Sequence, residues 1–217
     1  MTADSASINL THHFLIAMPG LEDAAFAKSV VYVCEHSERG ALGLVINKPS
    51  DLSMEGLFDK VDLPLHRQDL MMAPVLQGGP VHTERGFVLH DAMVIDVSAA
   101  EDTSEAAQES AALMAVSDKE SVYASTMTIP GGLEMTTSKD VLEALSMGAG
   151  PKRVLISLGY SAWGEGQLES ELAENSWLTV GADMAVIFDT PVDQRYERAM
   201  KLLGLESWML SSDVGHS

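Results

Sequence analysis

Ser161 is the residue whose surroundings most resemble those of a catalytic nucleophile. It lies two residues after Gly159 and shortly before Gly164, close to the Gly-x-Ser-x-Gly turn that presents a reactive serine between a strand and a helix. That motif needs a small residue two positions after the serine, because the strand and the helix must approach each other closely. Trp163 occupies this position instead. The spacing therefore predicts a backbone bend at Ser161 that serves architecture rather than catalysis.

A catalytic triad built on Ser161 would need an acid and a base later in the chain. Asp189 and His216 follow in the order found in hydrolases, but His216 is the penultimate residue of a polar tail. A general base must be held rigidly within hydrogen-bond reach of its nucleophile. We therefore predict no catalytic residues. An enzyme of unknown reaction, such as a hydrolase acting through the Ser161 segment or a bound metal, is the alternative hypothesis.

Two glycine-rich junctions at strand ends favour ligand binding over catalysis. Residues 159–166 suit a loop before a helix, but they lack the lysine of a phosphate-binding loop, and Glu165 would repel a phosphate. Residues 77–80 form a second such junction, and ligands commonly bind at strand ends in sheet proteins. We predict that both line one concave surface, with the Trp163 indole as a stacking wall. The predicted ligand-binding residues are Asn47, Gly78, Gly79, Pro80, Gly159, Ser161, Trp163, Gly164 and Gly166.

Cys34 and His36 share one face of a predicted strand and form the best candidate pair of metal ligands. No cysteine or histidine pair has zinc-finger spacing, and there is no His-Glu-x-x-His sequence. A buried cysteine beside a hydrogen-bonded histidine is the more common arrangement. We therefore predict no metal site and no cofactor.

Net charge limits the partners that the chain can bind. Thirteen Lys and Arg residues stand against 32 Asp and Glu residues, which gives a formal charge of −19. Such a field repels polyanions, so direct nucleic-acid binding and docking on anionic membranes are disfavoured. Arg195, Arg198 and Lys201 recur at roughly helical spacing, and we interpret them as a solvated helix face. The expected partner is a small molecule or another protein.

Cysteine content and hydropathy indicate the compartment. The single cysteine, Cys34, excludes an intrachain disulfide and suits a reducing environment. The first residues lack the basic start and apolar stretch of a secretory signal, and no apolar run approaches the roughly 20 residues that span a bilayer. We therefore predict a cytoplasmic protein without membrane association.

Runs of β-branched and aromatic residues between turn signals predict the strands that must position these groups. Residues 29–36 and 41–49 flank a turn at Arg39 and Gly40 and form the best hairpin candidate. Further strands are predicted at residues 12–18, 73–81, 85–91, 121–129, 133–138 and 153–160, and a strand region broken at Gly181 is predicted at residues 177–188.

Capping signals predict the helices. The predicted N-terminal signals are Ser53, a capping box of Thr137 and Asp140, and Thr190 followed by Pro191; a further helix is predicted at residues 166–175. Strands dominate the first half of the chain, while strands and helices alternate in the second. This order predicts an α+β fold with a mixed sheet and helices packed outside it.

The whole chain, residues 1–217, is expected to form one domain because 46% hydrophobic residues in a chain of this length suffice for one core. We expect order from about residue 10 to about residue 208, with loose tails at both ends. Residues 98–117 are acidic and alanine-rich, and we interpret them as a solvated insertion.

Four segments in a fixed order resemble the YqgE/AlgH family of bacterial proteins. The segments are "FLIAMPGLEDAAFAKSVVYVCEHSERGALGLVINKP", "QGGPV", "RGFVLH" and "GYSAWGEGQLESELAENSWL". The resemblance extends from about His13 to about Gly204. It departs at Ala24 and Ala25, where the family often has proline, and at Ser161, where the family usually has alanine. A family with alanine at this position has no obligatory serine nucleophile there.

The resemblance implies a fold rather than a reaction. It implies an α+β fold with a mostly antiparallel, strongly curled, barrel-like sheet. Members of the family are mostly uncharacterised, and some are called transcriptional regulators because of a link to alginate production. The resemblance supplies no catalytic residues. The expected function is therefore that of a non-catalytic regulatory or binding protein.

Overall fold

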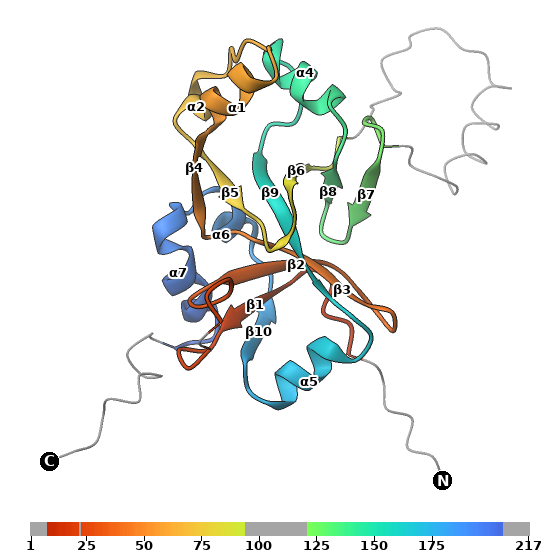
Figure 1. The fold of residues 1–217 in the computed structure, drawn as a ribbon, viewed down its shortest axis with the longest axis vertical. Helices are drawn as coiled ribbons and strands as arrows, with labels where there is room; N and C mark the ends of the chain where they lie inside the picture. The colour runs from red at the N-terminus through yellow and green to blue at the C-terminus, as the bar shows by residue number, and fades with distance from the viewer. Residues whose placement is uncertain (1–7, 22, 94–120, 206–217) are drawn as a thin grey trace, which may run out of the picture.

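A computed structural model describes residues 8–21, 23–93 and 121–205. Ten strands lie in this part of the chain and join into one strongly curled sheet (Figure 1). They are β1 (His13–Ala17), β2 (Val30–Ser37), β3 (Gly40–Val45), β4 (Pro49–Ser53), β5 (Pro74–Gln77), β6 (Val81–Asp91), β7 (Thr126–Ile129), β8 (Leu133–Thr136), β9 (Val154–Trp163) and β10 (Trp177–Gly181).

Six α-helices pack outside the sheet in the described residues. They are α1 (Met54–Lys60), α2 (Gln68–Met71), α4 (Asp140–Ser146), α5 (Gln167–Ala173), α6 (Met184–Phe188) and α7 (Arg195–Leu202), and the 3-10 turn η2 (Val192–Gln194) leads into α7. In Figure 1, α1, α2 and α4 lie at one end of the molecule, α5 lies at the other, and α7 lies at the side. The predicted α+β class with outside helices is confirmed.

Strand β9 is the centre of the topology. The sheet runs β10-β1-β2-β3-β9-β6-β8-β7, and β5 joins β4 to β9. All pairs are antiparallel except β5 with β9, where Leu76 is paired with Ser157. The sheet is therefore mixed and mostly antiparallel. The predicted hairpin is confirmed as β2 and β3, which pair antiparallel with Ser37 opposite Gly40.

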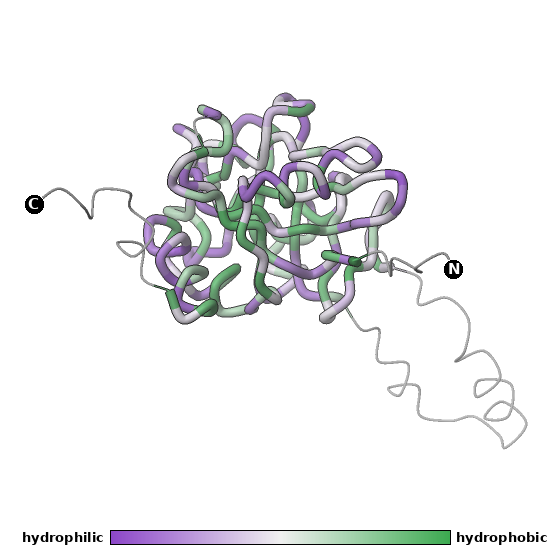
Figure 2. Tube along the Cα trace, turned by 90° about the horizontal axis from the view of Figure 1, so that it is seen from below, coloured by the Kyte–Doolittle hydropathy of each residue, from purple (hydrophilic) through white to green (hydrophobic). Residues whose placement is uncertain are grey.

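Three apolar clusters hold the helices against the sheet. One lies under α6 and α7 and includes Phe14, Tyr32 and Met200. The second, under α5, contains Trp163 and Trp177. The third lies under α1, α2 and α4. Figure 2 shows hydrophobic segments concentrated inside the molecule and hydrophilic ones at its margins.

Several predicted element boundaries are wrong. The strand predicted at residues 153–160 continues to Trp163, so most of the predicted loop at residues 159–166 is strand. The last predicted strand ends at Gly181, and α6 follows, capped by the Asp183 side chain, which accepts hydrogen bonds from the N–H groups of Ala185 and Val186. Ser53 is confirmed as the N-cap of α1.

Two predicted helix caps do not form. Helix α4 begins after Lys139, which has no side-chain capping bond, so the capping box of Thr137 and Asp140 is wrong. Thr190 donates its hydroxyl hydrogen to the carbonyl of Ala185 instead of capping α7.

The insertion predicted at residues 98–117 and both predicted tails lie wholly or mostly outside the described residues. Within the described ranges, none of the helices is long and apolar enough to cross a membrane.

Candidate functional site

Ser161 lies in the interior of the sheet. Its side chain is fully buried, and its Oγ donates a hydrogen bond of 3.2 Å to the carbonyl oxygen of Gly78. No ionisable side chain of the described residues shares a hydrogen bond with this hydroxyl. Among the described residues, the serine therefore has no activating base, and its burial closes it to a substrate.

Substitution of Ser161 by alanine is expected to lower the free energy of unfolding by about 1 kcal/mol. The loss is small because the Gly78 carbonyl keeps a second donor, the N–H of Val45, at 2.8 Å. Urea denaturation measures this change. A fluorophosphonate probe should label neither the original protein nor the variant, and stoichiometric labelling of Ser161 would contradict this assignment.

Trp163 is largely buried in the core under α5. Its side chain is 4% exposed and lies against Phe26 and Trp177, with ring centroids 5.9 and 6.0 Å away. The indole Nε1 donates to Oε2 of Glu171 at 2.9 Å. The prediction that Trp163 shares one concavity with residues 77–80 is wrong, because Trp163 lines a different cavity from Gly79 and Pro80; a ligand role for Trp163 itself stays a prediction.

Three of the predicted glycines allow the β5–β6 turn to approach the backbone of β9 closely. A Cβ on Gly79 would collide with the carbonyl group of Tyr160, and a Cβ on Gly159 would lie 2.6 Å from the Gly79 carbonyl oxygen. Gly78 is confined in the same way by Gly159 and Ser157. The turn between β5 and β6 is thus pressed against β9, where only glycine fits.

The remaining predicted site residues divide between two places. Gly164 donates its N–H to the Gln167 side chain at 3.0 Å, and Gly166, with φ +69°, precedes α5. Asn47 accepts from the N–H of Val30 and donates to the Lys28 carbonyl, so it holds the turn before β2.

Gly79 and Pro80 line one cavity, Asn47 lines a second, and Lys48 borders both. The predicted single concave surface therefore does not form. A ligand role for Asn47, Gly79 and Pro80 stays a prediction.

Cys34 and His36 do not point to a metal site. The Cys34 thiol is buried, which raises its pKa. Nδ1 of His36 accepts from the N–H of Leu10 at 3.0 Å, so Nε2 carries the proton and donates to Glu169 at 2.9 Å. In the part of the chain that the structure describes, no three His, Cys, Asp or Glu side chains gather as potential metal ligands.

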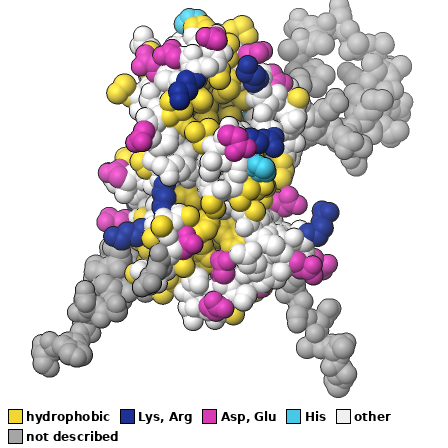
Figure 3. Space-filling view, in the orientation of Figure 1, with side chains coloured by type: hydrophobic (Ala, Val, Ile, Leu, Met, Phe, Trp, Pro, Cys, Tyr) yellow, Lys and Arg dark blue, Asp and Glu magenta, His cyan; other side chains and the backbone are white. Residues whose placement is uncertain are grey.

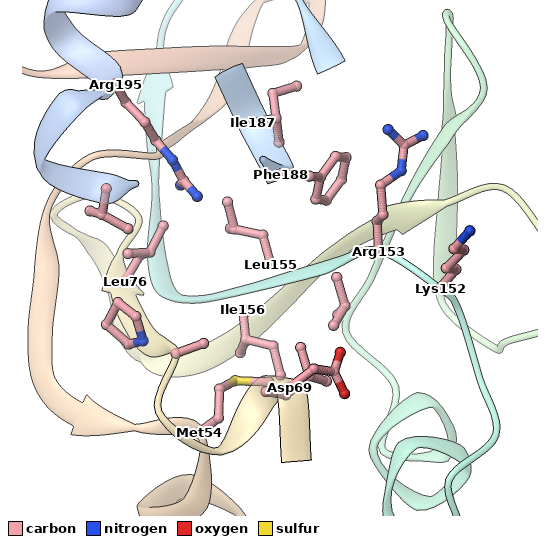
Figure 4. Close-up of a pocket in the computed structure, with 15 residues that line it drawn as sticks. Met54, Asp69, Leu76, Lys152, Arg153, Leu155, Ile156, Ile187, Phe188 and Arg195 are labelled. Atoms are coloured by element: carbon pink, nitrogen blue, oxygen red, sulfur yellow. The ribbon is translucent and has the colours of Figure 1, made fainter. Parts of the chain in front are cut away.

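A cavity of about 290 Å³ lies between the start of β9, strand β5, and the segment formed by α6, η2 and α7 (Figure 4). Most of its lining residues are apolar, and Figure 4 shows Leu155, Ile187 and Phe188 around the hollow. The lining contains no Ser, Thr, Tyr, Cys or His side chain. It therefore offers no hydroxyl or thiol nucleophile and no histidine general base.

Arg195 places a positive charge at this cavity. Its side chain reaches the hollow from α7 in Figure 4, although the residue is only 7% exposed. Nε donates to the Thr190 carbonyl at 3.0 Å, and Nη1 donates to the Ile46 carbonyl. Burial lowers the pKa of the guanidinium to about 10, so it remains charged at neutral pH. None of the carboxylates in the described residues forms an ion pair with it.

Two ionisable groups of the rim, Asp69 and Arg153, are already paired. Asp69 receives two hydrogen bonds from Arg67, at 2.9 and 2.6 Å, which lower the pKa of its carboxyl group. Arg153 is held by Asp91 at 2.6 Å and lies over the Phe188 ring. Lys152 is exposed. The charge that is not balanced within the cavity is therefore positive, and the site suits an anion.

Sequence reasoning missed Arg195 as a site residue. The interpretation of Arg195 as part of a solvated helix face is wrong, while Arg198 and Lys201 of that group are exposed. The available signal was its spacing, since Ala199 lies four residues later and is fully buried.

The curled sheet and its outer helices define an α+β protein, and one of its cavities is lined by the buried Arg195. A sequence model described as AlgH-like matches residues 14–208, and the chain belongs to this family. UPF0301 proteins from Paracidovorax citrulli and Polaromonas sp. are 72% and 70% identical to it, with full coverage of both chains in each case. The family named from the sequence resemblance is thereby confirmed.

Two solved structures share the fold. The solution structure of the AlgH protein from Pseudomonas aeruginosa has a TM-score of 0.68 and 40% identity, and each chain is fully covered. Protein DIP2367 from Corynebacterium diphtheriae has a TM-score of 0.64 over 94% of this chain and 92% of that one. At 17% identity, this second likeness concerns the fold alone.

Proposed function

We propose that this chain is a non-catalytic regulatory protein that binds a small organic anion in the cavity beside Arg195. The supporting observation is a buried guanidinium that faces an apolar hollow without an ion-pair partner among the described residues. Burying an unpaired charge is costly, and a bound anion would offset that cost.

The cavity's size and lining favour a small amphipathic ligand. Its volume of about 290 Å³ lies at the low end for ligand pockets. The two backbone carbonyls that bind Arg195 fix the orientation of its planar guanidinium. The proposed ligand has one carboxylate against Arg195 and a short apolar body against Leu155 and Phe188.

Regulation through a ligand or a protein partner also fits the charge of the chain. A net charge of −19 opposes direct contact with DNA phosphates. On the face in Figure 3, acidic and basic side chains are intermingled, with apolar surface between them. A role in transcription would therefore act through another protein. The proposed compartment is the cytoplasm, where the single Cys34 thiol stays reduced.

Linear carboxylates with short alkyl chains are expected to stabilise the protein, while their uncharged amides are not. At a ligand concentration about tenfold above Kd, the melting temperature should rise by about 3 °C. The Arg195→Met variant should lose this shift, because it lacks the charge that pairs with the carboxylate. Differential scanning fluorimetry with isothermal titration calorimetry measures both effects.

The matched control is Arg198→Met, which removes an exposed arginine from the same helix and should keep the shift. Urea denaturation shows whether Arg195→Met remains folded. Arg195→Lys tests whether a positive charge is sufficient without the planar guanidinium group. Equal shifts from acids and amides, or binding that survives in Arg195→Met, would contradict the proposed function.

A further inference from the structure

Lys48 is a second cationic group that forms no ion pair with a carboxylate of the described residues. It lies just before β4, and its Nζ donates to the carbonyl oxygens of Ala25 at 2.7 Å and Ala24 at 3.2 Å. Burial lowers the pKa of the ammonium group, and the charge of Asp23 only partly opposes this effect. Two of its three N–H donors are therefore fixed and one is available.

The Lys48 side chain borders a cavity of about 320 Å³. Gln77 and Thr83 supply an amide and a hydroxyl there, while Pro80 and Leu158 supply apolar surface. Lys48 is the only charged side chain in this lining. Such a lining suits a ligand with one negative charge and several hydroxyl groups.

This cavity is separate from the one beside Arg195. Their linings share no residue. Leu76 lines the Arg195 cavity, whereas the next residue of β5, Gln77, lines the Lys48 cavity. Successive side chains of a strand point to opposite faces, so the two cavities lie on opposite sides of β5.

The Lys48 cavity also differs from a neighbouring cavity in the charges of its lining. A third cavity, of about 430 Å³, includes Lys48 and Asn47 but also the carboxylates of Asp193 and Glu197. Lys28 lines that cavity too, so its two carboxylates offset its two ammonium groups, and an anion gains less there than beside Lys48 alone. The available N–H of Lys48 therefore favours an anion on the side of Gln77 and Thr83.

We propose that the cavity bordered by Lys48, Gln77 and Thr83 is a second binding site, which takes a small polyhydroxylated carboxylate. The ammonium group pairs with the carboxylate, and the Gln77 amide and Thr83 hydroxyl bind the ligand's hydroxyl groups. A phosphate is a poorer match because its charge of about −1.5 to −2 would face a single ammonium group. Gly79 and Pro80, which sequence analysis assigned to a ligand site, form part of this wall.

The test is a titration of the 15N-labelled full chain with gluconate, followed at the backbone amides of Gly79 and Thr83. Sorbitol provides the hydroxyl groups without the charge, and butanoate provides the charge without the hydroxyl groups. Gluconate should give saturable shifts at both amides, with an affinity about tenfold or more above that of either comparison compound. Lys48→Met should lower the affinity for gluconate by about tenfold or more.

Lys28→Met is the matched control, because Lys28 is exposed and lines the neighbouring cavity but not this one. It should leave gluconate binding unchanged, and Lys48→Arg should bind more tightly than Lys48→Met. The dispersion of amide signals shows whether each variant is folded. Sorbitol binding as tightly as gluconate, equal losses in the Lys28 and Lys48 variants, or no saturable shift up to about 50 mM would overturn the proposal.

Discussion

Replacement of Trp163 with alanine is expected to lower the free energy of unfolding by about 3–5 kcal/mol. The indole is almost fully buried beneath α5, where Phe26 and Trp177 pack against it. Its removal leaves a cavity that these rings cannot fill without moving. Urea denaturation followed by far-ultraviolet circular dichroism measures the loss.

Trp163→Phe separates packing from hydrogen bonding. The phenyl ring retains much of the contact with Phe26 and Trp177 but cannot donate to Glu171. Oε2 of Glu171 would still accept from the Trp177 indole at 2.8 Å. The loss of the Trp163 hydrogen bond should therefore cost only about 1–2 kcal/mol, in addition to the cost of the smaller ring. An unchanged unfolding midpoint in Trp163→Ala would show that the indole does not contribute to the core and would favour its predicted role as a ligand wall.

Local patterns were sufficient to predict most of the strands. Residues 30–34 are continuously buried in β2, as an apolar run covered on both faces requires. The run Met184–Phe188 was assigned to a strand because a short apolar run has no decisive period. The Asp183 cap before it was a readable signal that favoured a helix.

The predicted end of β9 is too early because a glycine can mark either the start of a loop or a close backbone contact inside a strand. Gly159 has φ +71° and resembles the start of a loop in sequence, yet the strand continues for four residues beyond it. Glycine inside a strand often marks the close approach of another backbone, here the turn at Gly79. One sequence cannot distinguish these cases because the approaching segment lies 80 residues earlier.

The Arg195 cavity could not be assembled from local sequence. The Ile46 carbonyl that helps hold Arg195 is 149 residues away along the chain. Helical spacing could place Arg195 on the buried face of α7, but only the tertiary fold shows that Leu155 and Phe188 share its cavity. The wrong interpretation of Trp163 has the same origin, since its partner Phe26 lies far away in sequence.

Replacement of Gly79 with alanine is expected to destabilise the protein by about 3 kcal/mol or more. Its φ of +151° is a conformation that residues with a side chain rarely adopt. The added Cβ would also collide with the Tyr160 carbonyl and the Ser161 hydroxyl. Relief would require the β5–β6 turn to move away from β9, and this would break the 2.8 Å bond from the N–H of Gly78 to the Leu158 carbonyl.

Gly86→Ala is the matched control, because it adds the same methyl group to a nearby glycine of β6 that has nothing within 4 Å of the new Cβ. Its effect on unfolding should stay within about 0.5 kcal/mol. Thermal and urea unfolding of the two variants compare a confined glycine with an open one. Equal stability of Gly79→Ala and Gly86→Ala would mean that the turn is not pressed against β9. The burial of Ser161 would then also be in doubt. The same turn supplies the Gly78 carbonyl, to which the Ser161 hydroxyl donates.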